Sequence, residues 1–176
     1  MECILLWNQT EEKMLKMLWE CIKLSLEEDK TIWNFLFLPH EYNIENTIES
    51  IKNGKAKYWF VSLENWKING FMRIMQIFPN SERFQHHFSL KMLYVLPEKR
   101  KKWIALKLIN EAMNFIILEF KNIDVFHFEL DVQSENTKAI ELYRKSGFKK
   151  SWEFEYAIKL DEKYISLSHF EKNIFR

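Results

Sequence analysis

The chain has 176 residues, of which 47% are hydrophobic and 16% aromatic, and its formal net charge is +1. This length fits one domain with a full core, the composition excludes a disordered chain, and the near-neutral charge gives no general attraction to nucleic acid or membranes. Cys3 and Cys21 have no metal-ligand spacing, so we expect two free thiols. With no signal-like segment and no apolar run of about 20 residues, we expect a cytoplasmic protein.

The first half of the chain predicts two helices among several strands. An apolar period of 3.6 residues predicts an amphipathic helix from Thr10 to Leu26, and Asn43 caps a second helix that ends near Asn53. Residues 33–38 are ambiguous. The predicted strands cover residues 3–7, 58–63, 70–77 and 86–96, with a hairpin at 64–69 and a loop at 79–85. Pro97 ends the last of these strands.

The second half alternates helices and strands. Residues 103–120 form a long amphipathic helix, and residues 125–132 alternate apolar and polar side chains as a half-buried strand does. Asn136 then caps a short helix that Gly147 ends. We expect strands at 148–153 and 154–160, followed by a tail over 161–176. This order predicts an α/β fold with a mixed sheet.

The strand at 86–96 changes the face on which it carries apolar side chains. Phe88, Leu90 and Met92 share one parity, whereas Leu93 and Val95 share the other. One extra residue would bring both sets to one face, so we predict a β-bulge near Met92 and Leu93. The alternative is a strand that is buried on both faces.

The short helix and its flanks resemble the last motif of the GNAT superfamily of acyl-coenzyme-A-dependent N-acetyltransferases. Residues 132–148 match the pattern V-x-x-x-N-x-x-A-x-x-L-Y-x-x-x-G-F. The resemblance covers residues 1–160 and implies a mostly antiparallel central sheet, flanked by helices and split between the fourth and fifth strands. Residues 161–176 would then be a tail that packs on this domain or on a partner subunit, as in a homodimer.

A second segment resembles the loop that holds the pyrophosphate of coenzyme A in this family. Residues 95–105 read V-L-P-E-K-R-K-K-W-I-A, against a family pattern V-x-P-x-x-R-x-x-G-x-G/A. Trp103 stands where glycine is usual: a helical site with negative φ tolerates it, whereas a site with positive φ or a close phosphate does not. The resemblance implies that acetyl-coenzyme A is bound by Leu93, Val95, Arg100, Lys101, Lys102, Trp103, Ile104, Ala105 and Asn136. The basic residues also fit a solvated helix start or a nucleic-acid patch, but we expect neither a nucleic-acid nor a membrane partner.

The resemblance also implies catalytic roles. Tyr143 matches the family's general acid, which protonates the leaving thiolate, although a core aromatic at helical spacing explains it as well. Asp131 is our choice of general base, against the alternative of a solvated strand-end carboxylate. Adjacent His86 and His87 would point to opposite faces of a strand, so we expect no metal site.

These observations predict an enzyme that moves an acetyl group from acetyl-coenzyme A to a primary amine of a small molecule or peptide. The transfer would be direct, within a ternary complex. Because of Trp103, a second hypothesis stays open: a catalytically inactive protein of the same fold that binds or regulates a partner.

Overall fold

The computed structural model describes residues 2–6, 10–32, 44–53, 57–160 and 162–176. The elements of the first half are β1 (Glu2–Leu6), α1 (Glu12–Ile32), α2 (Ile44–Lys52), β2 (Lys57–Glu64), β3 (Lys67–Gln76) and β4 (His87–Val95). Those of the second half are η2 (Pro97–Lys99), α3 (Ile104–Glu119), β5 (Val125–Gln133), α4 (Thr137–Lys145), β6 (Lys149–Leu160) and β7 (Lys163–Phe175). The ambiguous segment 33–38, the expected helix cap Asn43 and the end of the first expected strand, Trp7, lie outside the described residues.

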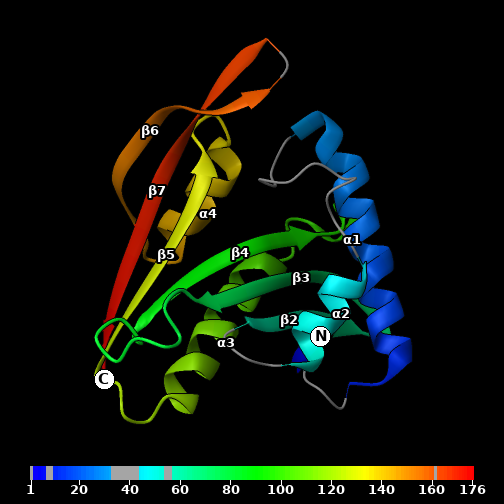
Figure 1. Cartoon of the computed structure of the whole chain (residues 1–176). Coiled ribbons are helices and arrows are strands. Elements are labelled where there is room, and N and C mark those ends of the chain that lie inside the picture. The colour runs from blue at the N-terminus through cyan, green and yellow to red at the C-terminus, as the bar shows by residue number, and fades with distance from the viewer. Residues whose placement is uncertain (1, 7–9, 33–43, 54–56, 161) are drawn as a thin grey trace.

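One seven-stranded sheet organises the molecule, with the strand order β1-β2-β3-β4-β5-β7-β6 (Figure 1). All neighbouring strands are antiparallel except β4 and β5, which are parallel. The predicted mixed α/β fold with a mostly antiparallel sheet is therefore confirmed. No helix among the described residues is long and apolar enough to cross a membrane.

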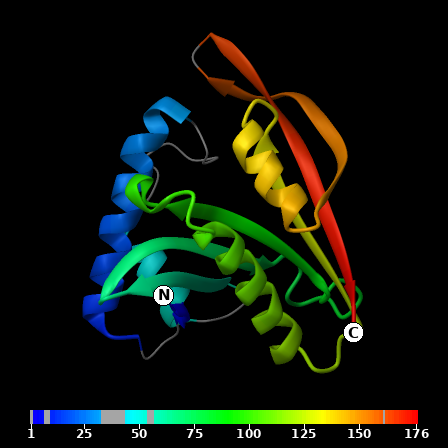
Figure 2. The same cartoon turned by 180° about the vertical axis from the view of Figure 1, so that it is seen from behind.

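Two hydrophobic cores cover the two faces of the sheet. One core lies between the sheet and the helices α3 and α4 (Figure 2) and contains Phe88, Phe126 and Phe128, none of which is exposed. The other lies between β1–β4 and the helices α1 and α2, around Trp59 and Phe71. Among the described strands, only β1–β4 contribute side chains to this core. The same face of β5 carries polar residues instead, in the alternation that predicted this strand.

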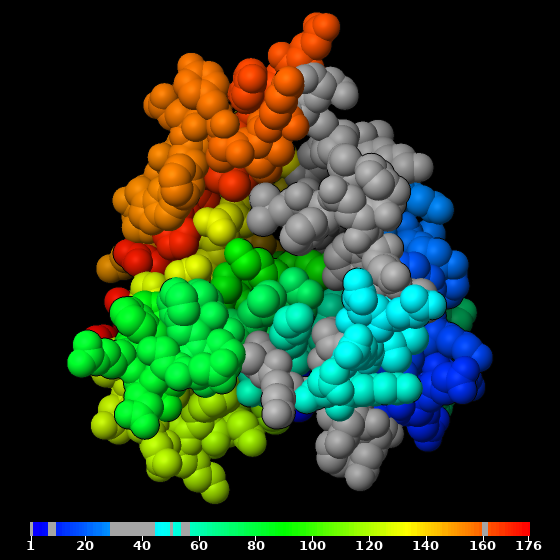
Figure 3. Space-filling model, viewed as in Figure 1, coloured from blue at the N-terminus to red at the C-terminus, as the bar shows by residue number. Residues whose placement is uncertain are grey.

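The last two strands differ from those predicted from the sequence. The two strands expected at 148–153 and 154–160 are a single strand, β6, whose register against β7 shifts twice. The segment expected to be a tail contains β7, which lies between β5 and β6 and therefore packs within this domain. The β6–β7 hairpin rises at the top of the molecule in both the ribbon and the space-filling view (Figure 3).

Candidate active site

The strands β4 and β5 pair at their beginnings and then diverge (Figure 1). Their register comprises only His87↔His127, Phe88↔Phe128 and Ser89↔Glu129. Beyond Ser89, β4 continues to Val95 beside β3, whereas β5 continues beside β7. The predicted split between the fourth and fifth strands is therefore present, and backbone groups of β4 that face the split are available to a ligand.

The predicted β-bulge is present at the start of this divergence. Phe71 pairs with Tyr94 and Arg73 with Lys91, so the single residue between them on β3 faces two residues on β4. Met92 has a φ of 56°, as the extra residue of a bulge. The bulge brings Phe88, Leu90, Leu93 and Val95 to the core under α3, whereas Met92, which was expected on the same face, packs against the other core.

Trp103 occupies a left-handed backbone conformation at the start of α3. Its φ and ψ are 62° and 10°, and it is the N-cap of the helix, without a capping hydrogen bond from its side chain. A positive φ of this kind favours glycine. A residue with a side chain adopts it at a conformational free-energy cost of about 1–2 kcal/mol. The indole is 70% exposed, so the strain is not offset by burial. The amides of the first turn of α3, at Ile104 and Ala105, have no partner within the helix and can bind an anion.

Arg100 does not reach toward the helix start but is held by α1. Its two terminal nitrogens donate to the two carboxylate oxygens of Glu28, at 2.6 and 2.7 Å, and its Nε donates to the Val95 carbonyl at 3.0 Å. Tyr94 donates a further hydrogen bond to Glu28 at 2.8 Å. Lys101 and Lys102 are exposed. The Arg100 side chain therefore fixes the loop, and the charge open to an anion comes from the two lysines.

Glu28→Gln is expected to lower the free energy of unfolding by about 1 kcal/mol at neutral pH. The hydrogen bonds from Arg100 hold the pKa of the Glu28 carboxyl below its ordinary value of 4.5, although burial opposes them. A lowered folded-state pKa stabilises the protein above pH 4.5, and this contribution disappears as the pH falls through the folded value. Urea unfolding between pH 7 and pH 3 measures the difference between the two proteins, which should shrink on the acid side.

The control for this variant is Glu20→Gln. Glu20 forms an exposed ion pair with Lys23 on the same helix, at 2.6 Å, and such pairs contribute little to stability. A Glu28→Gln difference that is constant with pH, or no larger than that of Glu20→Gln, would contradict the assigned role of Glu28.

The helix α4 lies beside α3 on the same face of the sheet. Its predicted cap is confirmed, because the Asn136 side chain accepts a hydrogen bond from the Ala139 amide at 3.1 Å. Gly147 follows the helix with a φ of 86°. Tyr143 is partly buried against Phe148 and Phe170, and burial raises its pKa to about 12. The phenol is therefore protonated at neutral pH, as a general acid must be.

Asp131 lies on the opposite face of the sheet from Tyr143, just beyond the last pair of β4 and β5. It accepts a hydrogen bond from Lys91 Nζ at 3.2 Å, and its other oxygen lies 2.8 Å from Nδ1 of His169. His169 is a residue of β7, only 8% exposed, whose ring stacks on Trp152. Asp131 is thus already paired, and it orients an imidazole across the strand pair Asp131↔His169.

His169 is not among the site residues predicted from the sequence, because residues 161–176 were expected to form a tail. The alternation of Ile165 and Leu167 with Ser166 and Ser168 is a period-two signal that predicts a strand. Continued for two residues, it would have placed His169 on the same face as Leu167.

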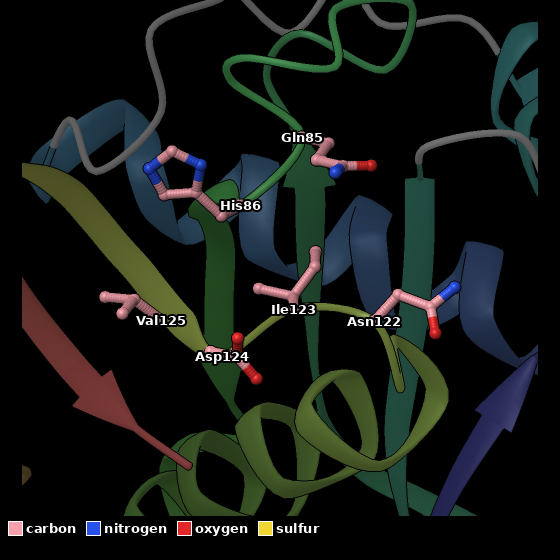
Figure 4. A pocket seen from close by; sticks show the side chains of 6 residues that line it. All are labelled: Gln85, His86, Asn122, Ile123, Asp124 and Val125. Carbon is pink, nitrogen blue, oxygen red and sulfur yellow. The ribbon is translucent and has the colours of Figure 1, made fainter.

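A separate hollow of about 220 Å³ lies at the opposite end of these strands (Figure 4). Its lining residues precede or begin β4 and β5, and they are Gln85, His86, Asn122, Ile123, Asp124 and Val125. Because the parallel strands diverge at their carboxyl ends, this hollow is remote from the bulge and from the start of α3. We therefore place the candidate site at the divergence rather than in the hollow.

Known proteins share this architecture. A family model described as the acetyltransferase (GNAT) family matches residues 12–148. A GNAT-family acetyltransferase from Streptococcus pneumoniae superposes with a TM-score of 0.77 at 21% identity, covering 98% of this chain and 99% of that one. A ribosomal-protein-alanine N-acetyltransferase from Brucella melitensis gives 0.71 at 18% identity over 97% and 99%. A spermidine N-acetyltransferase from Vibrio cholerae, in complex with CoA and spermine, gives 0.70 at 21% over 97% and 95%. No curated protein sequence matches the chain.

Proposed function

Because the chain belongs to the GNAT family of acetyltransferases, we propose that it transfers an acetyl group from acetyl-coenzyme A directly to a primary amine. The divergence of β4 from β5 is the observation that carries this proposal. Beyond its last pair with β5, the bulged strand β4 leads to the start of α3. The fold neighbours that act on spermidine and on a ribosomal-protein alanine make an amine acceptor the natural choice for the assay.

The residues that we assign to the reaction lie on opposite faces of the sheet. Tyr143 and the start of α3 lie on the face of the core under α3 and α4, whereas Asp131, His169 and Lys91 lie on the other face. Only where β4 and β5 diverge can a substrate on one face meet a group on the other. We assign the thioester to the side of α3 and the amine to the side of His169.

Each side chain then has a task in proton transfer. The acceptor amine must lose a proton to become a nucleophile, and the leaving thiolate gains one. His169 takes the proton from the amine through Nε2, because its Nδ1 donates to Asp131. Asp131, our choice of base from the sequence, acts by orienting that ring. Tyr143 supplies the proton for the thiolate, and its raised pKa keeps the phenol protonated.

The cofactor is assigned to the residues that the family pattern matched. Acetyl-coenzyme A supplies an activated acetyl group, and its pyrophosphate suits the free amides of Ile104 and Ala105, with Lys101 and Lys102 beside them. Leu93 and Val95 lie on β4 beyond its last pair with β5, and we assign their backbone to the arm of the cofactor; Asn136 fixes the start of α4. Arg100 contributes by holding the loop through Glu28.

Trp103→Gly is expected to tighten acetyl-coenzyme A binding by about threefold or more, because the indole beside the free amides crowds a bound phosphate. The free energy of unfolding of the Trp103→Gly variant should differ from that of the wild-type protein by less than about 1 kcal/mol. Glycine relieves the strain of the left-handed backbone, and this gain offsets its larger entropy in the unfolded state. Isothermal titration and urea unfolding measure the two effects.

Trp66→Gly is the matched control. Trp66 also has positive φ, at 59°, and its side chain is 71% exposed, but it lies in the turn between β2 and β3. It should change stability as Trp103→Gly does and leave the affinity unchanged. Equal affinities for Trp103→Gly and the wild-type protein would mean that the indole does not crowd the phosphates.

Direct transfer is favoured over an acyl-cysteine intermediate. Cys3 and Cys21 are free thiols, and burial raises the pKa of each to about 12. Both are therefore protonated and poor nucleophiles at neutral pH. Release of free coenzyme A in the presence of a panel of polyamines and peptides, with mass analysis of the acetylated product, tests the proposal. Binding of acetyl-coenzyme A without transfer to any amine would favour the inactive binding protein instead.

A further inference from the structure

A cluster of metal-ligating side chains lies on the polar face of the sheet, where β4 and β5 still pair. His87 of β4 faces His127 of β5, and Glu129 follows on β5. One ligand atom from each of these three residues lies within 4.8 Å of the other two. In the sequence only His86 and His87 are adjacent, whereas the sheet places His127 and Glu129 beside His87.

The imidazole of His127 is already oriented as a ligand. Its Nδ1 lies 2.8 Å from the side-chain oxygen of Asn173, which only accepts hydrogen bonds, so Nδ1 carries the proton. The other nitrogen, Nε2, lies 3.9 Å from a carboxylate oxygen of Glu129 and 3.8 Å from one of Glu171. A cation placed between Nε2 and these two carboxylates would interact favourably with all three groups. Metal-bound histidines commonly show this same hydrogen bond from the second ring nitrogen to a carbonyl oxygen.

A buried hydroxyl lies next to the cluster. Ser89 pairs with Glu129 in the register, and it shares the face of His87 because it follows two residues later on β4. It is 3% exposed, and its Oγ has no hydrogen-bond partner among the described residues. A buried hydroxyl usually has a partner, and a water molecule held by a metal would supply one.

We propose that His87, His127 and Glu129 bind a divalent transition-metal ion, with Zn²⁺ as the best match, and that a water fills the fourth position. Two imidazoles and one carboxylate are a common zinc set with an open position. The ion would join β4 to β5 beside the three residue pairs of their register, just before the two strands diverge. The role of the ion would be to hold β4 and β5 together where they begin to diverge, independently of acetyl transfer.

Metal titration of the whole protein tests this site. After chelation and dialysis, Zn²⁺ should bind with a stoichiometry of one and raise Tm by about 5 °C or more at 100 times its Kd. Co²⁺ in its place should give the visible absorption of a tetrahedral site without a thiolate band. His127→Gln and Glu129→Gln should each weaken Zn²⁺ binding by about 10-fold or more.

His86→Gln is the matched control, because it removes the neighbouring imidazole that lies outside the cluster. It should keep the affinity and the shift in Tm. The proposal is overturned if Zn²⁺ leaves Tm unchanged, if His127→Gln binds Zn²⁺ like the wild-type protein, or if His86→Gln loses binding equally.

Discussion

Tyr143→Phe is expected to lower kcat by about 100-fold or more while the Kd of acetyl-coenzyme A stays within about threefold. The variant removes only the phenolic hydroxyl, so the contacts of the ring with Phe148 and Phe170 remain and the fold should be kept. Stopped assays of acetyl transfer and isothermal titration separate the two quantities. A fall in kcat without a fall in affinity identifies a group that acts in the transition state.

The pH profile of the wild-type enzyme gives the same prediction a second check. Burial raises the pKa of Tyr143 to about 12, so the protonated acid persists across the neutral and mildly alkaline range. We therefore expect no alkaline fall in kcat below about pH 10. Wild-type turnover in Tyr143→Phe would remove this residue from the mechanism, and an alkaline fall near pH 8 that Tyr143→Phe abolishes would mean that the phenol ionises there.

His169→Gln is expected to lower kcat/KM by about 100-fold at pH 7. The loss should be much smaller at a pH above the pKa of the acceptor amine. Glutamine fills a similar volume and can keep a hydrogen bond to Asp131, but it cannot take a proton. At high pH the amine is already neutral and needs no base. A pH series of kcat/KM therefore distinguishes the loss of a base from damage to the structure, which would lower the rate equally at every pH.

Asp131→Asn provides the comparison for this variant. Its amide oxygen can still accept from Nδ1 of His169, but the ion pair with Lys91 loses its charge. We expect a smaller fall in kcat/KM, about 10-fold, because the ring stays in place. If Asp131→Asn instead loses as much as His169→Gln and recovers at high pH in the same way, Asp131 itself is the base, as the sequence suggested.

The parts of the fold that depend on local pattern were predictable. The parity change between Leu90 and Leu93 predicted the bulge, because a strand has a fixed period of two and only an extra residue restores one apolar face. Asn136 and Gly147 marked the ends of α4 for similarly local reasons, the side-chain cap and the positive φ. The divergence of β4 from β5 came from the family resemblance rather than from periodicity.

The pairings that define the site could not be predicted in the same way. Arg100 and Glu28 are 72 residues apart, and nothing local distinguishes this glutamate from its exposed neighbours on α1. The pairing of His169 with Asp131 required β7 to insert between β5 and β6, which depends on the order of strands in the sheet. His87, His127 and Glu129 likewise converge only because β4 and β5 are parallel and in this register.

A structure of the complex with coenzyme A tests the central claim most directly. The account predicts the pyrophosphate at the amides that follow Trp103 and the pantetheine arm between the diverging strands, alongside the backbone at Met92 and Leu93. The thiol should then lie within hydrogen-bonding reach of Tyr143. Coenzyme A bound elsewhere on the protein, or no binding at millimolar concentration, would contradict the account.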